Sequence, residues 1–138
     1  MFRKQMTGFT ILELLIAIAV LGVLAAIAIP SYQGNLQSSR RTDGITALLE
    51  LQGQQTQWRA NNVTYAANLT ADLGWSTSDS PDGYYTISLT NVTATTYTAT
   101  ATPKVGSSQE GDSCGSLILT ESGPDISTAE KKSCWKKQ

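Results

Sequence analysis

The N-terminal part of the chain is dominated by one long run of apolar side chains. From Phe9 to Ile29 the side chains are apolar or nearly so, and the only charged one is the carboxylate of Glu13. This run is about as long as the roughly 20 residues that a helix needs to cross a bilayer. A carboxylate in hydrocarbon costs about 2–3 kcal/mol even on lenient insertion scales. The pattern therefore predicts a membrane helix in which the costly carboxylate of Glu13 has a specific role.

Beyond Pro30 the apolar residues recur at helical spacing, so the helix is predicted to continue to about Ala60 with one buried face. The members of this stripe are Tyr32, Leu36, Ile45, Leu48, Leu49, Leu51 and Trp58. The charged side chains between them are expected to form a solvated face; they are Arg40, Arg41, Asp43 and Glu50.

Short alternating segments follow a polar connection over residues 61–83. Residues 84–90 and 97–102 alternate as half-buried antiparallel strands do, and residues 114–120 form a third candidate strand. The inward positions of the first two are Tyr85, Ile87, Leu89, Tyr97, Ala99 and Ala101. One long helix followed by three or four short strands predicts an α+β fold, with a short antiparallel sheet packed against the helix.

Three interpretations fit the N-terminal segment. In a secretory signal, Arg3 and Lys4 would form the basic start and residues 26–28 the cleavage site, but the apolar run is long for such a signal. A plain signal-anchor helix fits the length and leaves Glu13 unexplained. The third interpretation uses every residue: a short basic leader ends in Gly8, Phe9 follows, and Glu13 is the fifth residue after the glycine.

The stretch GFTILEL, which begins at Gly8, closely resembles the prepilin signal of type IV pilins. The resemblance implies that residues 1–8 are a leader, removed when prepilin peptidase cuts between Gly8 and Phe9 and methylates the new amine. It also implies that residues 9–35 remain as the transmembrane and assembly helix. Residues 36–138 are then expected to form a globular pilin domain in the periplasm or outside the cell.

This resemblance also gives Glu13 a role. In the first turn of a helix a carboxylate gains only a few tenths to about 1 kcal/mol from the helix dipole, which is too little to offset burial. A buried charge needs a partner, and cleavage would supply the Phe9 amine of a neighbouring subunit. Pilins also have a glycine and a proline at the offsets of Gly22 and Pro30, around a segment that can unwind. We therefore expect Glu13, Gly22 and Pro30 to act in assembly.

Composition and charge point away from catalysis. The chain has 138 residues, a formal net charge of -1 and no histidine. It contains no nucleophile, nucleotide-binding or metal-binding motif that we recognise, and the spacing of Asp72, Asp79 and Asp82 does not match a calcium loop. We expect a protein that is not an enzyme and needs no metal or cofactor.

Two cysteines, Cys114 and Cys134, lie outside the cytoplasm if the basic residues Arg3 and Lys4 set the topology. An even pair in an oxidising compartment favours a disulfide, with two free thiols as the alternative. Type IV pilins typically carry a disulfide-bounded loop near the C-terminus, and the resemblance places this pair in it.

A basic cluster surrounds the second cysteine and consists of Lys131, Lys132, Trp135, Lys136 and Lys137. Lysines contact phosphates and an exposed indole stacks on bases. The alternative is a solubilising tail with the tryptophan docked on the disulfide loop. Loss of Arg3 and Lys4 with the leader makes the mature chain more acidic. DNA is therefore a possible partner, but we expect no strong DNA binding by the isolated domain.

The sequence is thus identified as a type IV pilin whose layout is most like minor pilins of the PilE type. The resemblance implies a structural subunit that waits in the bacterial inner membrane. With other pilins and the pilus assembly machinery it then enters an extracellular filament for adhesion, twitching motility or DNA uptake. Two alternatives remain open. One is a DNA-uptake receptor that binds duplex DNA; the other is a type II secretion pseudopilin, against which the cysteine pair argues.

Overall fold

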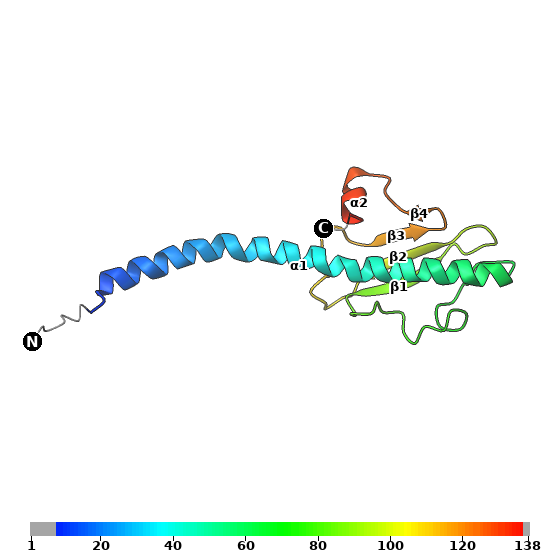
Figure 1. The fold of residues 1–138 in the computed structure, drawn as a ribbon, viewed down its shortest axis with the longest axis horizontal. Coiled ribbons are helices and arrows are strands. Elements are labelled where there is room, and N and C mark those ends of the chain that lie inside the picture. The colour runs from blue at the N-terminus through cyan, green and yellow to red at the C-terminus, as the bar shows by residue number, and fades with distance from the viewer. Residues whose placement is uncertain (1–7, 137–138) are drawn as a thin grey trace, which may run out of the picture. The chain divides into compact units, whose positions relative to one another are not determined.

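A computed structural model describes residues 8–136 and has an α+β architecture (Figure 1). Its contacts divide the chain into two units, with the boundary between Asn35 and Leu36. This boundary falls inside helix α1 (Ile11–Asn61). The predicted fold class is confirmed: a long N-terminal helix, a short antiparallel sheet and a C-terminal disulfide are all present.

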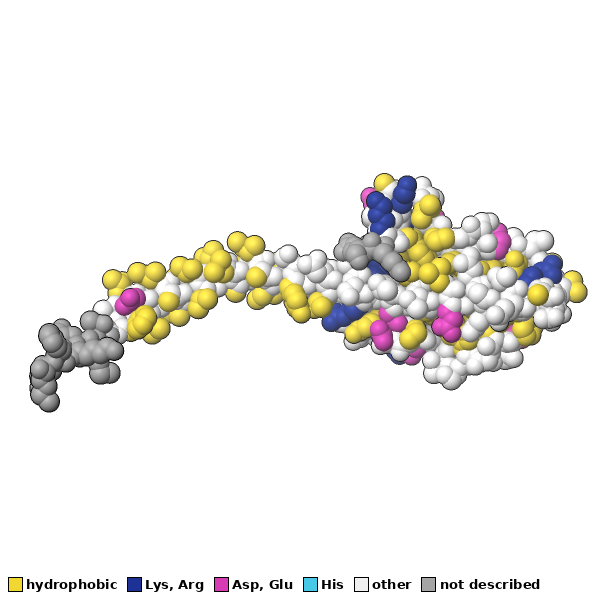
Figure 2. Space-filling view, viewed as in Figure 1, with side chains coloured by type: hydrophobic (Ala, Val, Ile, Leu, Met, Phe, Trp, Pro, Cys, Tyr) yellow, Lys and Arg dark blue, Asp and Glu magenta, His cyan; other side chains and the backbone are white. Residues whose placement is uncertain are grey.

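The first unit consists of the apolar half of α1. Helix α1 is long and apolar enough to cross a membrane, and none of the side chains in its apolar window is buried. Figure 2 shows hydrophobic side chains spread along this part of the helix. A helix that is apolar on all sides needs an apolar surrounding, which lipid or neighbouring helices can supply.

The second unit contains a sheet of four antiparallel strands in the order β1-β2-β3-β4. The strands are β1 (Tyr85–Thr90), β2 (Thr98–Pro103), β3 (Leu117–Thr120) and β4 (Gly123–Pro124). The third strand begins later than the predicted residue 114. The reason is that Cys114 is held in a disulfide and Gly115 has a φ of 56°, which takes the chain out of the extended conformation.

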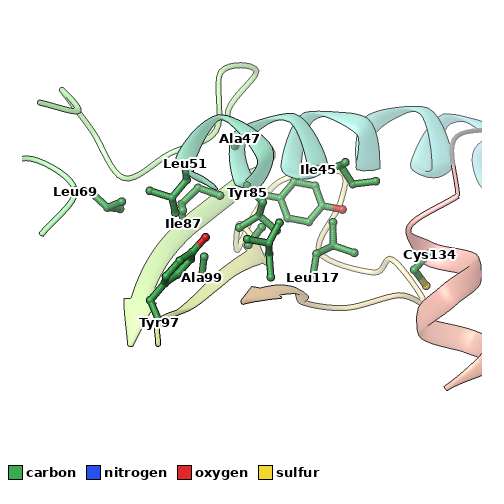
Figure 3. Close-up of a cluster of buried hydrophobic side chains, with 13 residues drawn as sticks. Ile45, Ala47, Leu51, Leu69, Tyr85, Ile87, Tyr97, Ala99, Leu117 and Cys134 are labelled. Carbon is green, nitrogen blue, oxygen red and sulfur yellow. The ribbon is translucent and has the colours of Figure 1, made fainter. Parts of the chain in front are cut away.

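The core lies between the second half of α1 and the inner face of the sheet (Figure 3). Leu48 and Leu51 of the helix are fully buried, as are Ile87 of β1 and Leu119 of β3. Full burial of each such side chain contributes roughly 1.5–3 kcal/mol. The inward positions predicted for β1 and β2 are buried or half-buried, from Tyr85 to Ala101.

Part of the predicted helix pattern was wrong. Tyr32 and Leu49 are exposed, whereas Asp43, which was expected in solvent, is buried. Asp43 lies one turn before Ala47 and therefore points to the same side of α1. Its carboxylate accepts hydrogen bonds from the Ser80 hydroxyl and from the backbone N–H of Asp82 at 2.9 Å. Asp43 therefore ties the connection before β1 to the helix.

Gly44 permits the closest approach between α1 and the sheet. A Cβ built on Gly44 would lie 2.9 Å from a ring carbon of Tyr85, which is closer than real Cβ contacts. Gly53, on the same helix, has open space where its Cβ would be. The two glycines therefore form a matched pair, one required by packing and one not.

We predict that Gly44→Ala lowers the free energy of unfolding of residues 36–138 by roughly 1–3 kcal/mol, because the methyl group must displace the buried Tyr85 ring. Gly53→Ala should instead leave stability unchanged or raise it by up to about 1 kcal/mol, since alanine is the better helix former. Urea unfolding of both variants measures the difference. Equal effects from the two substitutions would contradict the packing argument.

Candidate functional site

The start of α1 holds Glu13 in a capping box. The Thr10 hydroxyl accepts from the Glu13 N–H at 3.2 Å, and the Glu13 carboxylate accepts from the Thr10 N–H at 3.5 Å. This reciprocal pair satisfies backbone donors that would otherwise be unpaired at the helix start. This capping role was not predicted, although the T-x-x-E spacing before an apolar run signals it. Within a single chain, Glu13 is therefore already hydrogen-bonded to Thr10.

The other residues expected to act in assembly lie at exposed positions. Gly8 and Phe9 precede the helix and are exposed. Residues 1–7 of the expected leader lie outside the described residues. Gly22 has no neighbour that a side chain would meet. Pro30 lies inside α1, which is continuous from Gly22 through Pro30. The proline cannot donate a helix hydrogen bond at this point, so the segment before it is held less firmly than a regular helix.

The disulfide between Cys114 and Cys134 joins the entry to β3 with the last residue of helix α2 (Ala129–Cys134). The two Cα atoms are 5.8 Å apart, an ordinary distance for a bridged pair. Closing a loop of this length contributes roughly 3 kcal/mol in the chain-entropy account. The prediction of a bridge is confirmed, and no free cysteine is present in the described part of the chain.

The basic cluster is divided by the fold. Trp135 follows α2, is half-buried and packs against the core, so its ring is docked on the domain. Lys131 forms an ion pair with Asp125, with 2.5 Å between Nζ and Oδ2. Lys132 and Lys136 are exposed, and their side chains bond to no other described residue. Figure 2 shows dark-blue side chains gathered where α2 lies. Lys137 lies outside the described residues.

The remaining basic side chains of the second unit are engaged elsewhere. Lys104 pairs with Asp79, and Arg59 donates to the backbone carbonyls of Asn62 and Ala94. The guanidinium of Arg40 lies over the Tyr84 ring, 5.3 Å from its centroid. Lys132 and Lys136 are therefore the cationic groups most available to an anionic partner in the described part of this unit.

Arg41 and Asp112 form the main buried ion pair of the second unit. Arg41 donates from Nε and Nη2 to the two carboxylate oxygens, at 2.9 and 2.6 Å. Its side chain is 11% exposed, and that of Asp112 is 1% exposed. The prediction that Arg41 lies on a solvated face is therefore wrong. The same carboxylate accepts from Gln109 at 2.9 Å and from the Cys114 N–H at 3.4 Å. Arg41 thus fixes the entry to the disulfide.

Charge and burial act in opposite directions on this pair. Burial alone would raise the pKa of Asp112, but the hydrogen bonds and charge of Arg41 more than offset it, and the pKa falls below the ordinary 3.8. The hydrogen bond to Asp112 likewise raises the pKa of Arg41 above its ordinary value. Both groups are therefore ionised throughout the neutral range.

The acidic residues that could suggest a calcium site bind different partners in the fold. Asp72 accepts from the backbone N–H groups of Ala67 and Asn68, and Asp79 pairs with Lys104. Within residues 8–136 no three acidic, cysteine or histidine side chains are grouped as metal ligands would be.

Two family models match the chain. Residues 30–118 match the family described as "Type IV minor pilin ComP, DNA uptake sequence receptor". Residues 3–29 match the "Prokaryotic N-terminal methylation motif". The first match contains Cys114 and ends before α2 and Cys134. Together the two matches cover the apolar helix and most of the second unit.

Curated relatives include pilus and secretion proteins. The chain is 37% identical over 81 residues to "Fimbrial protein" of Neisseria meningitidis serogroup B, covering 56% of this chain and 45% of that protein. It is 34% identical over 80 residues to "Fimbrial protein EcpC" of Eikenella corrodens, covering 53% and 51%. It is 32% identical over 62 residues to "Type II secretion system core protein G" of Klebsiella pneumoniae, covering 45% and 44%. The chain thus spans about half or less of the length of these relatives.

The buried ion pair generates a prediction on stability and pH. Asp112→Asn should cost roughly 3 kcal/mol at pH 7, because it leaves the Arg41 charge without its partner. A carboxylate whose pKa is lowered in the folded state stabilises the protein above the unfolded pKa, and this stabilisation is lost as pH falls through the folded pKa. The difference between wild type and variant should therefore be constant above pH 5 and shrink below about pH 4.

Urea unfolding from pH 2.5 to 7 measures this difference. Asp79→Asn is the matched control, since it breaks an exposed pair and should cost less than about 1 kcal/mol. A deficit for Asp112→Asn that persists unchanged at pH 2.5 would contradict the assignment.

Proposed function

We propose that this chain, which belongs to the type IV minor pilin ComP family of DNA uptake sequence receptors, is a pilus subunit held in its filament by the first half of α1. The observation that carries the proposal is the helix itself. Its apolar side chains are exposed on all sides, and Glu13 is the one acid among them. Pilin and fimbrial families are structural in general, which fits a subunit without catalytic chemistry.

The first step of this function is processing in the bacterial inner membrane. The match of residues 3–29 to the methylation motif supports cleavage between Gly8 and Phe9 by prepilin peptidase. The new N-terminus would be the methylated amine of Phe9. Removing the leader leaves this amine next to Thr10, at the same end of α1 as the Glu13 carboxylate.

Assembly then transfers the apolar helix from lipid to a bundle of pilin helices. The small residues of this segment, including Gly22, allow helices to approach closely. Because Pro30 leaves one helix hydrogen bond unmade, the Gly22–Pro30 segment is proposed as the part that can unwind on entry. The partners are other pilin subunits and the pilus assembly machinery, and the destination is the extracellular filament.

The charge of Glu13 and its capping role can be separated by mutation. Glutamine serves in a capping box as glutamate does, but it cannot form an ion pair with a neighbour's Phe9 amine. Thr10→Ala has the opposite effect, since it removes the hydroxyl of the box and keeps the acid. The two substitutions therefore test different functions of the same turn.

We predict that Glu13→Gln is inserted and processed normally and that its amount in sheared pili falls at least tenfold. Thr10→Ala should be incorporated at close to the wild-type level. Immunoblots of membranes and of sheared pili, each normalised to the major subunit, measure both quantities. Normal incorporation of Glu13→Gln would show that capping alone explains the residue and would reject the ion pair.

A second function, DNA binding, is favoured by two exposed lysines, Lys132 in α2 and Lys136 just after it. Lys132 and Lys136 are four residues apart, and the disulfide ties Cys134, which lies between them in the sequence, to Cys114. The family description supports this function. Trp135 is docked and Lys131 is paired, so we propose that each subunit contacts few phosphates and binds duplex DNA only weakly. Several copies along one filament would strengthen the attachment by avidity.

We predict that the full chain in non-ionic detergent binds duplex DNA with a dissociation constant above the micromolar level at physiological salt. Replacing Lys132 and Lys136 together with glutamine should weaken binding and reduce the slope of log affinity against log salt by up to about 1.8, or 0.9 for each phosphate contact. Lys104→Gln is the control and should change little. Fluorescence anisotropy from 20 to about 200 mM salt measures the slope, and an unchanged slope in the double variant would reject this site.

A further inference from the structure

We infer that Asp125 competes with DNA phosphates for Lys131. Its carboxylate holds Lys131 in an ion pair and so keeps one cation of the α2 surface from binding phosphate. This inference rests on the DNA binding proposed above and concerns how that surface is restrained. It adds a residue outside the basic cluster, on the connection between β4 and α2.

The position of Asp125 is fixed by the backbone. Its N–H donates to the carbonyl of Ile118 on β3 at 2.9 Å. Its Oδ1 accepts from the Ser127 N–H at 3.1 Å, which closes the turn before α2. Its Oδ2 accepts from Lys131 Nζ at 2.5 Å. Both carboxylate oxygens are therefore engaged, one by the turn and the other by the lysine.

The ion pair is nevertheless open to solvent. The side chain of Lys131 is 48% exposed and that of Asp125 is 24% exposed. Exposed pairs of this kind contribute little to stability, so an incoming phosphate can compete for the lysine. The carboxylate is ionised at neutral pH, since the hydrogen bond from Lys131 lowers the pKa of Asp125 to about 2.

The competition has two consequences for a DNA strand on α2. Lys131 contributes a phosphate contact only if it leaves Asp125. The carboxylate also repels any phosphate that approaches α2 within a Debye length of about 8–10 Å. Neutralising Asp125 should therefore both release a cation and remove a repulsion.

The chain contains a matched control for this effect. Lys104 and Asp79 form a second exposed pair with the same 2.5 Å separation and similar exposure, 44% and 34%. It belongs to the region around β1 and β2, since Asp79 bridges to Thr86 and Lys104 follows Pro103. Asp79→Asn changes the net charge as Asp125→Asn does without touching α2.

The test measures duplex DNA binding by the full chain in non-ionic detergent, by fluorescence anisotropy over a range of salt. Asp125→Asn should bind about two- to fivefold more tightly at low salt, the factor expected from releasing an exposed pair. Its salt slope should be steeper by up to about 0.9, one additional phosphate contact. Asp79→Asn should bind as wild type does. Adding Lys131→Gln to Asp125→Asn should cancel the gain in slope.

The substitution is chosen to preserve the turn, because the Asn oxygen can still accept from the Ser127 N–H. Asp125→Ser, whose hydroxyl can also accept, provides a second variant, and thermal unfolding checks both. If wild type binds and Asp125→Asn gains nothing, or if Asp79→Asn gains as much, the inference is overturned and the proposed function remains. If only Asp125→Asn binds, the inference holds and the function proposed for the wild type is overturned. If neither binds, both are overturned.

Discussion

The ion pair between Arg41 and Asp112 is the contact through which α1 positions the C-terminal part of the second unit. Asp112 is held by two hydrogen bonds from the helix and in turn accepts from the Cys114 N–H. Cys114 is bridged to Cys134, the last residue of α2. A sequence of bonds therefore leads from the helix to the exposed lysines. These contacts are needed to hold α2 in place, because a helix of only six residues would not remain folded alone.

Helix α1 meets two different requirements along its length. From Ile11 to Ile29 its side chains need an apolar surrounding on every side, and the single acid there caps the helix. After the boundary at Asn35 one side is buried under the sheet, and acids on that side must be satisfied internally. Asp43 meets this condition because its carboxylate accepts hydrogen bonds from the Ser80 hydroxyl and from backbone N–H groups of residues 82 and 84. Gly44 meets a steric one, since it leaves room for the Tyr85 ring.

The sequence predicted the features that depend on local pattern. The α+β class, the apolar helix and the alternation of β1 and β2 follow from periodicity, and the family matches confirm the resemblance to type IV pilins. It could not predict contacts between distant residues. Arg41 and Asp43 look like surface charges until Asp112 and Ser80 are brought to them across the fold. Helix α2 was missed because its six residues are too few to show a period.

The same limitation applies to the basic cluster near the C-terminus. In the sequence its lysines are equivalent neighbours of a tryptophan. In the fold, Lys131 is paired with Asp125 and the Trp135 ring is docked on the core. Lys132 in α2 and Lys136 just after it are exposed. Because few of these lysines are free to bind phosphate, we propose only weak and salt-sensitive DNA binding. This binding is secondary to assembly of the subunit into the filament.

If the chain is a pilus subunit, its apolar helix is kept, processed and built into a filament. The intact mass of the chain recovered from sheared pili measures this outcome. We expect a chain that begins at Phe9, carries one methyl group on its amine, and has the Cys114–Cys134 bridge closed. A chain that keeps Met1, one that begins after Ala28, or absence from the filaments would contradict it.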